Sequence, residues 1–133
     1  MTGTPEEVIR AAVEAYVAGD NNGLEQQLGL HVRIIGSEQR DNFDGRDHAL
    51  HRLGAELERR RRLNSVGGTL VDAAMAAEGV YQSGDMAWWS GSGNLNVDGT
   101  YHNETSWTVV LNREGEGMKG EWKIVHSHFS IHR

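Results

Sequence analysis

The chain has 133 residues, of which 38% are apolar and 24% are charged, an ordinary composition for one globular domain. Its formal net charge of −6 argues against a general nucleic-acid binder, because phosphate contacts require clustered Lys and Arg. Cysteine is absent, so disulfides, thiolate metal sites and cysteine nucleophiles are excluded. No apolar run is long enough to cross a bilayer. We therefore expect a single cytoplasmic domain over residues 1–133, without nucleic-acid or membrane partners.

The N-terminal part predicts a helix, a break, a second short helix and a strand. Thr4 followed by Pro5 and Glu7 is typical of a helix start, with Thr4 as the cap and Glu7 placed for a capping box. Apolar residues at helical spacing predict one buried stripe: Ile9, Ala12, Val13, Tyr16 and Val17. After a break at 19–22, we expect a short helix over 24–30 and a strand over 32–35.

A third helix is expected after residues 42–45. Its predicted buried stripe is Ala49, Leu50, Leu53 and Leu57. The helix then runs into a basic cluster at residues 59–62. Because cations suit the C-terminal end of the helix dipole, we interpret this cluster as a solvated helix end rather than a nucleic-acid patch.

From about residue 69 onward, the sequence predicts a four-stranded antiparallel meander. β-branched and aromatic residues alternate there with Gly and Asp turns, expected at 83–85, 98–99 and 113–120. The Asp98-Gly99 pair is a strong signal for a two-residue hairpin. Three helices leading into a long curved sheet make an α+β layout in which the helices cover one sheet face.

Alternation in the last two predicted strands assigns side chains to the two faces of the sheet. The odd positions are mostly apolar and are predicted to lie under the helices: Trp107, Val109, Leu111, Val125, Phe129 and Ile131. The even positions are mostly polar and are predicted to face outward. Trp88 and Trp89 fall on opposite faces, which suggests that a second subunit partly covers the outward face.

Four segments resemble SnoaL-like domains of the nuclear transport factor 2-like superfamily. The segment EWKIVHSHFS at 121–130 is similar to the family's closing strand, and residues 106–113 to the strand before it. Residues 83–91 resemble the central strand, and 18–20 the first helix break. The resemblance implies a cone-shaped, curved antiparallel β-sheet covered by three N-terminal helices, the nuclear transport factor 2-like or cystatin-like α+β roll. It also implies a cavity between the helices and the concave sheet face, and often a homodimer packed through the sheets.

The same resemblance limits the reactions and the ligands that we expect. Steroid isomerases of the superfamily use a carboxylate base and a carboxylic acid donor, and an ungapped placement puts Gly36 and Trp107 at those positions. Neither residue can do that chemistry. The kinase II association domain places cations where this chain has Val109 and Phe129, so an anionic ligand is disfavoured. The fold hosts isomerases, cyclases, hydratases, dehydratases and plain binding modules, so it indicates architecture better than function.

Within the cone, we expect a mostly apolar pocket with few polar groups, as small-molecule sites usually have. The predicted lining is Tyr16, Trp89, Trp107, Val109, Ser127 and Phe129. The candidates for a catalytic role are Glu38, Asp72 and Tyr16, and a carboxylate base would need an apolar environment to work near neutral pH. Core filling would require the same apolar residues, so a packed interior is the alternative.

His126 and His128, together with Glu104, are a weaker metal-binding alternative. Two histidines and a carboxylate can hold a metal ion when they converge. Alternation places all three on the outward face, so a polar surface or a dimer contact is the favoured interpretation and no metal is expected. A glycine-rich phosphate loop is also absent from the sequence, and no cofactor is expected.

Two classes of function follow. The first is a cofactor-free isomerase, cyclase or hydratase acting on a small, mainly apolar, polyketide-, terpenoid- or steroid-like molecule. The second is a non-catalytic ligand-binding or dimeric assembly module. A buried carboxylate or histidine within reach of the cavity would favour the enzyme, whereas a closed cone with an extensive sheet-to-sheet contact would favour the module.

Overall fold

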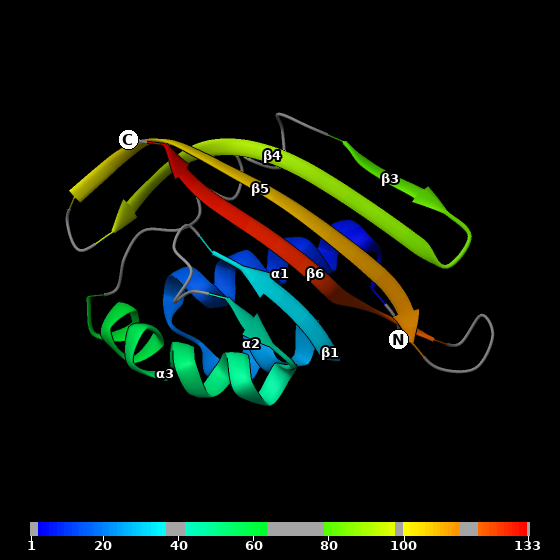
Figure 1. Ribbon diagram of the computed structural model, residues 1–133, viewed down its shortest axis with the longest axis horizontal. Helices are drawn as coiled ribbons and strands as arrows, with labels where there is room; N and C mark the ends of the chain where they lie inside the picture. The colour runs from blue at the N-terminus through cyan, green and yellow to red at the C-terminus, as the bar shows by residue number, and fades with distance from the viewer. Residues whose placement is uncertain (1–2, 37–41, 64–78, 98–99, 115–119, 133) are drawn as a thin grey trace.

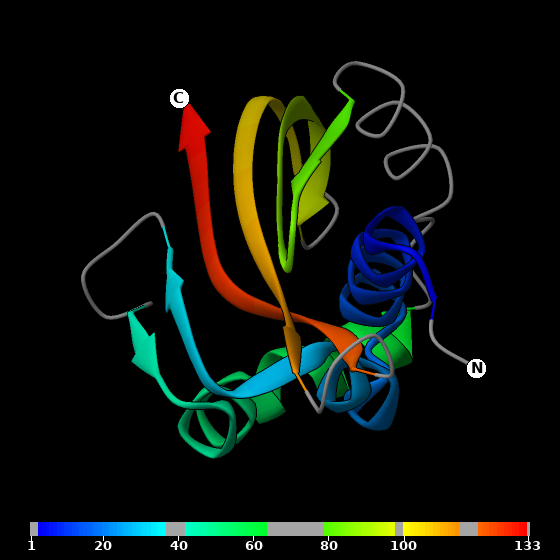
Figure 2. The same cartoon turned by 90° about the vertical axis from the view of Figure 1, so that its right-hand side faces the viewer.

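The computed structural model describes residues 3–36, 42–63, 79–97, 100–114 and 120–132 (Figure 1). In chain order the elements are α1 (Pro5–Ala18), α2 (Asn21–Gln27), β1 (Leu28–Ile35), β2 (Phe43–Asp44), α3 (Arg46–Leu63), β3 (Val80–Ser83), β4 (Met86–Val97), β5 (Thr100–Glu114) and β6 (Glu121–His132). The strands form a six-stranded sheet in the order β2-β1-β6-β5-β4-β3. The long strands bend along their length, and α1 lies inside the bend (Figure 2). No helix in the described ranges is both long and apolar enough to span a membrane.

Both ends of α1 are fixed by the residues that the sequence indicated. Thr4 Oγ1 accepts a hydrogen bond from the Glu7 backbone N–H at 3.2 Å, and Pro5 occupies the first helical position. At the other end, Gly19 adopts a left-handed conformation with φ of 76°. The Gly19 N–H donates to the Tyr16 carbonyl at 3.2 Å, an ending that favours glycine because it has no Cβ. The predicted start of this helix and its break at Gly19 are confirmed, whereas residues 21–22, predicted as part of the break, already belong to α2.

The predicted helix over 24–30 is wrong in its second half. α2 spans Asn21–Gln27 and is capped by Asp20, whose Oδ1 accepts from the Gly23 N–H at 3.0 Å. Leu28 already belongs to β1, where it pairs with Ile124 of β6. This pairing with a strand almost a hundred residues away decides the local conformation, and a short apolar run does not reveal it.

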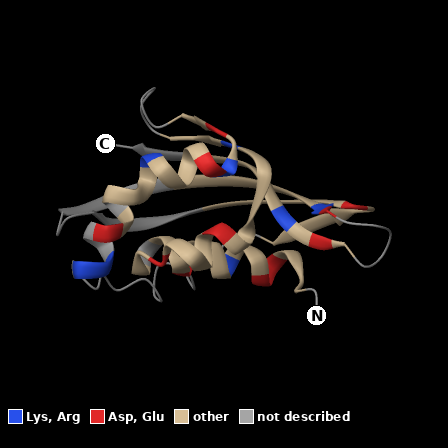
Figure 3. Cartoon of the chain, turned by 90° about the horizontal axis from the view of Figure 1, so that it is seen from below, with Lys and Arg blue, Asp and Glu red and all other residues tan. Residues whose placement is uncertain are grey.

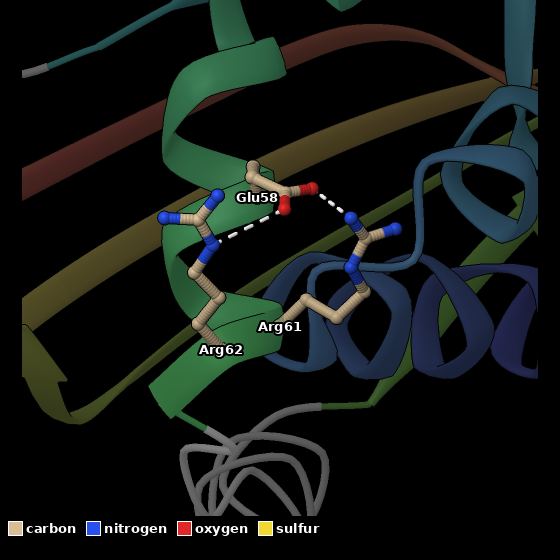
Figure 4. Close-up of polar contacts among 3 residues, drawn as sticks. All are labelled: Glu58, Arg61 and Arg62. Atoms are coloured by element: carbon tan, nitrogen blue, oxygen red, sulfur yellow. Dashed lines mark hydrogen bonds and ion pairs between the residues drawn. The ribbon is translucent and has the colours of Figure 1, made fainter.

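α3 agrees with the predicted third helix. Ala49 and Leu57 are buried in the core, and Leu50 and Leu53 pack partly against it. In the last turns, Glu58 forms ion pairs with Arg61 and with Arg62, the latter at 3.2 Å from Nε to Oε1 (Figure 4). Both arginine side chains are exposed, so this helix end is solvated, as expected. Acidic and basic residues are interspersed over the described chain (Figure 3).

The four-stranded meander is confirmed, because β3, β4, β5 and β6 pair in succession and antiparallel. Gly84, with φ of 59°, lies in the first predicted turn, and Val97 pairs with Thr100 across the second. The expected onset of the sheet near residue 69 lies outside the described residues. β1 joins β6 in parallel, and β2 pairs with β1. Three helices and a curved sheet confirm the predicted α+β cone, although the parallel β1–β6 pair was not anticipated.

A β-bulge in β6 changes which residues face the helices. Val110 pairs with His126 and Leu111 pairs with Ile124, so Val125 is the extra residue. On β5 the odd positions are the more buried, as predicted. Before the bulge, however, the buried residues of β6 are the even-numbered Trp122 and Ile124. The inward assignment of Val125 is therefore wrong, because a bulge inserts one residue and reverses the alternation.

Candidate functional site

The strand register brings side chains from all six strands into one row on the concave face. Each residue is the cross-strand partner of the next, and such partners share a face of the sheet. From β3 to β2 this concave row is Val80, Trp89, Val109, Ser127, Ile34 and Phe43. Three of the residues predicted to line a pocket, Trp89, Val109 and Ser127, are therefore neighbours. Trp89 and Val109 are buried, and Ser127 is half-buried.

α1 covers this face of the sheet. Its residues Val8, Ile9, Ala12 and Ala15 share one core cluster with Trp89, Val109 and Leu111. Two other predicted pocket residues, Tyr16 from α1 and Trp107 from β5, are partly buried and pack against that cluster. The concave row thus lies beneath the helix, as a site between helices and sheet requires.

Trp107 lies in the next row along the strands. It pairs with Gly91 on β4 and with Phe129 on β6. Gly91 is buried and has no side chain, so nothing beyond its backbone fills the sheet position beside Trp107. The backbone register places residue 129 here, whereas its side chain is outside the described part of the structure.

Trp89 has an unsatisfied polar atom. The residue is 1% exposed, and its indole Nε1 is buried without a hydrogen-bond partner in the described structure. Leaving a buried donor unpaired costs about 1–3 kcal/mol, and most such groups in folded proteins find a protein or water partner. The sequence offered no signal for this feature, because it depends on how the strands curve around one side chain.

The described carboxylates lie away from the concave row. The carboxylates whose side chains the structure describes are exposed, apart from Glu58, which is half-buried beside Arg61 and Arg62 on α3. Of the three catalytic candidates, Tyr16 is within the described chain, and Glu38 and Asp72 lie outside the described residues. The part of the site that the structure describes is therefore uncharged, with the Ser127 hydroxyl and the Trp89 N–H as its polar groups in the row.

The candidate metal residues are separated along the strands. His126 pairs with Val110 and His128 with Thr108, whereas Glu104 pairs with His132. Thr108 lies four positions after Glu104 on β5, or about 13 Å away at the usual rise per residue. The register that would bring Glu104 opposite either histidine does not form. Among the described side chains, no group of three metal-ligating residues converges.

The outward face carries a second row that sequence reasoning found only in part. From β3 to β2 this outer row is Tyr81, Trp88, Val110, His126, Arg33 and Asp44. Tyr81 and Trp88 stack with ring centroids 6.1 Å apart and are 59% and 43% exposed. Alternation at Trp88 and Trp89 indicated the aromatic surface. Arg33 was missed, because its place in the row depends on the unanticipated pairing of β1 with β6.

A SnoaL-like domain model matches residues 6–133. The chain belongs to the SnoaL-like domain family. No curated protein matches the sequence. Among solved structures, this SnoaL-like domain is similar to a candidate calcium/calmodulin-dependent protein kinase type II association domain from Thiobacillus denitrificans, with 18% identity, a TM-score of 0.65, and coverage of 100% of this chain and 98% of that one.

Two further structures have the same architecture. A candidate ketosteroid isomerase from Shewanella frigidimarina has 18% identity and a TM-score of 0.61, with 93% of this chain and 92% of that chain covered. A nuclear transport factor 2-like protein with a cystatin-like fold from Novosphingobium aromaticivorans has 16% identity and a TM-score of 0.60, covering 95% and 78%. At these identities the likeness establishes the nuclear transport factor 2-like fold.

Proposed function

We propose that this SnoaL-like domain binds a small, mainly apolar molecule between α1 and the concave face of the sheet. The observation that carries the proposal is the concave row, in which Trp89, Val109 and Ser127 are neighbours beneath the helix. Small-molecule sites combine apolar and aromatic walls with few polar groups. The missing side chain at Gly91, beside Trp107, supports room for a ligand next to the row.

The catalytic alternative is a cofactor-free isomerase, cyclase or hydratase acting on a polyketide-, terpenoid- or steroid-like substrate. Similarity to a candidate ketosteroid isomerase supports it. General base catalysis needs a proton acceptor within hydrogen-bond reach of the substrate, and the described carboxylates are not on the concave row. Catalysis would therefore depend on Glu38 or Asp72, and binding is the function that the described geometry supports best.

A matched pair of variants tests the binding proposal. Trp107→Ala removes an aromatic wall on the concave side, whereas His126→Ala removes a side chain of the outer row. Titration of a neutral apolar probe such as naphthalene, followed by line broadening in its proton NMR spectrum, should show weaker binding for Trp107→Ala only. Equal effects of the two variants, or no binding to the wild-type protein, would contradict the proposal.

We also propose that two copies of the chain associate through the outer sheet face. Tyr81, Trp88 and Met86 are at least 43% exposed there, and large exposed apolar side chains that cluster mark interaction sites. Two sheets packed face to face lie about 10 Å apart, which brings opposing side chains into contact. A second copy of the chain fits this face because the outer row, taken from β3 to β2, is complementary to the same row taken from β2 to β3.

That complementarity follows from the order of the row. A two-fold axis parallel to the strands, between β5 and β6, sets the aromatic end of one copy against the charged end of the other. Trp88 then faces the partner's Arg33, and Tyr81 faces the partner's Asp44. An Arg over a Trp ring contributes about 0.5–2 kcal/mol, and a tyrosine hydroxyl can donate to a carboxylate.

Sedimentation velocity at several protein concentrations tests the dimer. Trp88→Ala and Arg33→Ala should each weaken it, and the double variant should be little worse than either single one, because the two residues act on each other. Ser90→Ala, on an exposed neighbouring position of the same strand, is the control. A wild-type chain that sediments as a monomer throughout, or additive effects of the two substitutions, would refute the arrangement.

A further inference from the structure

The buried indole N–H of Trp89 indicates the chemical class of the ligand. We propose that the ligand is an uncharged molecule whose oxygen accepts a hydrogen bond from Trp89 Nε1. This inference rests on the proposed function, because it requires a small molecule on the concave row. It adds the chemical class of the ligand and the residue that recognises it.

No group in the concave row can satisfy this donor. Trp89 is 1% exposed, and its Nε1 has no partner within the described structure. Ser127 carries the other polar side chain of the row and lies two strands away, about 10 Å at the usual strand spacing. The flanking partners of Trp89 are Val80 and Val109, whose side chains have no acceptor. An acceptor supplied by a ligand would therefore complete the site.

The surroundings of the concave row favour an uncharged ligand. A carboxylate or phosphate bound here would need a cation, since burying an unpaired anion is costly. The described sheet positions in the concave row and in the rows on either side of it carry no Lys or Arg. Arg113 points to the same side of β5 but lies four residues from Val109, about 13 Å away. An anionic acceptor would thus be buried without a cation beside it, whereas a neutral carbonyl or ether oxygen needs no cation.

The guanidinium of Arg113 is, moreover, held at a different place in the sheet, although its buried Nε has no hydrogen-bond partner in the described structure. It lies over the Trp122 ring at 4.8 Å from the centroid, and its Nε is 3.9 Å from Asp85 Oδ1. Its backbone N–H also donates to the Asp85 carbonyl at 2.9 Å. These contacts hold the cation at the far end of the strand, so it reinforces the core there and does not serve the concave row.

A hydrogen bond from Trp89 Nε1 should strengthen binding of the ligand. The free energy cost of removing the Trp89 N–H from water was incurred when the chain folded, so a ligand oxygen recovers it without displacing a well-bound partner. A ligand with the oxygen should therefore bind about tenfold more tightly than one of the same shape without it, since the oxygen removes the free-energy cost of an unsatisfied buried donor. Ser127, with a hydroxyl that both donates and accepts, can take a second polar group at the other side of the ligand.

Three probes that share the naphthalene ring separate the effect of the ligand oxygen from the effect of its charge. Acetylnaphthalene has a neutral carbonyl oxygen, isopropenylnaphthalene replaces that oxygen by a methylene group, and naphthoate carries a charge. We expect the ketone to bind the wild-type protein about tenfold more tightly than the alkene, and naphthoate to bind most weakly. In Trp89→Phe, which keeps an aromatic ring but has no N–H, the ketone and the alkene should bind equally. Trp88→Phe is the matched control and should retain the difference.

A second measurement on the wild-type protein does not depend on any variant's folding. The chain has four tryptophans, and the indole resonances of a ¹⁵N-labelled sample can be assigned by single replacements. Acetylnaphthalene should shift the Trp89 Nε1–H resonance downfield, and isopropenylnaphthalene should not. If no probe binds, the proposed function fails. If ketone and alkene bind equally, if the Trp89 resonance does not respond, or if naphthoate binds best, this inference is overturned while the binding function stands.

Discussion

Trp88 and Trp89 are adjacent in β4, yet their side chains lie on opposite faces of the sheet. Trp89 is 1% exposed and belongs to the core, whereas Trp88 is 43% exposed and stacks on Tyr81. The alternation of a strand produces this division. Trp89 thus contributes to the interior and to the proposed ligand site, whereas Trp88 contributes to the proposed contact between two copies of the chain.

The two tryptophans should differ sharply in their effect on stability. Trp89→Ala leaves a cavity in the core and should lower the free energy of unfolding by about 3–5 kcal/mol. Trp88→Ala removes an exposed side chain and should cost the monomer less than about 1 kcal/mol. Urea unfolding at low protein concentration, where self-association contributes least, measures both. A larger loss for Trp88→Ala than for Trp89→Ala would mean that the two faces have been exchanged.

Gly19 and Gly84 provide a second matched pair, because both have positive φ, at 76° and 59°. A Cβ at Gly19 would lie 2.1 Å from the Leu57 carbonyl oxygen, whereas a Cβ at Gly84 would meet nothing within 4 Å. Gly84→Ala should therefore cost only the backbone strain, about 1–2 kcal/mol. Gly19→Ala should cost that strain plus the displacement of α1 from α3, together about 2–5 kcal/mol.

Thermal or urea unfolding of the two glycine variants distinguishes strain from steric conflict. Equal losses of stability would show that backbone conformation alone accounts for both positions. A clearly larger loss of stability for Gly19→Ala than for Gly84→Ala would confirm the close approach of the C-terminal end of α1 to α3. That approach fixes where Tyr16 lies over the sheet, since Tyr16 is only one turn of helix before Gly19.

Thr4 should contribute measurably to the stability of α1. Its Oγ1 accepts the Glu7 N–H at 3.2 Å, and replacing such a cap by alanine costs about 0.5–2 kcal/mol. Thr4→Ser keeps the oxygen and should retain most of that stability. Urea midpoints of the two variants provide the measurement, and the hydrogen bond would be unimportant if serine and alanine gave the same midpoint.

Helices were predictable from the sequence because their signals are local. Thr4, Pro5 and the periodic apolar stripe specify α1 within a few turns, and the same holds for Ala49 and Leu57 in α3. Alternation likewise predicted the burial of Val109 and Leu111 on β5. Each of these inferences depends only on residues that are close in sequence.

What could not be predicted depends on pairing between distant strands. Leu28 is strand rather than helix because Ile124 pairs with it, and Val125 forms a bulge because β5 and β6 share a register that no single segment encodes. The candidate site follows the same rule. Its residue types were predicted, but the concave row and the unpaired Trp89 N–H arise only once the six strands are aligned.

Deleting Val125 should leave the two faces of β6 unchanged. Val125 is the extra residue between the Val110–His126 and Leu111–Ile124 pairs, so its removal makes His126 and Ile124 adjacent without changing either pair. β6 would then alternate without interruption, and Trp122, Ile124 and Ser127 would all keep the concave face. The deletion variant should therefore retain a cooperative unfolding transition in urea, with a loss of about 1–3 kcal/mol for the missing half-buried side chain and the local change of twist.

Val125→Thr is the control for that deletion, because it keeps the chain length and the β-branched shape. It should retain a cooperative transition, with a loss of less than about 2 kcal/mol for replacing a half-buried methyl group by a hydroxyl. A deletion variant that loses its cooperative transition while Val125→Thr keeps it would show that β6 needs the local bend of the bulge as well as its pairing with β5. In that case the position of Ser127 opposite Val109 would depend on the bulge itself.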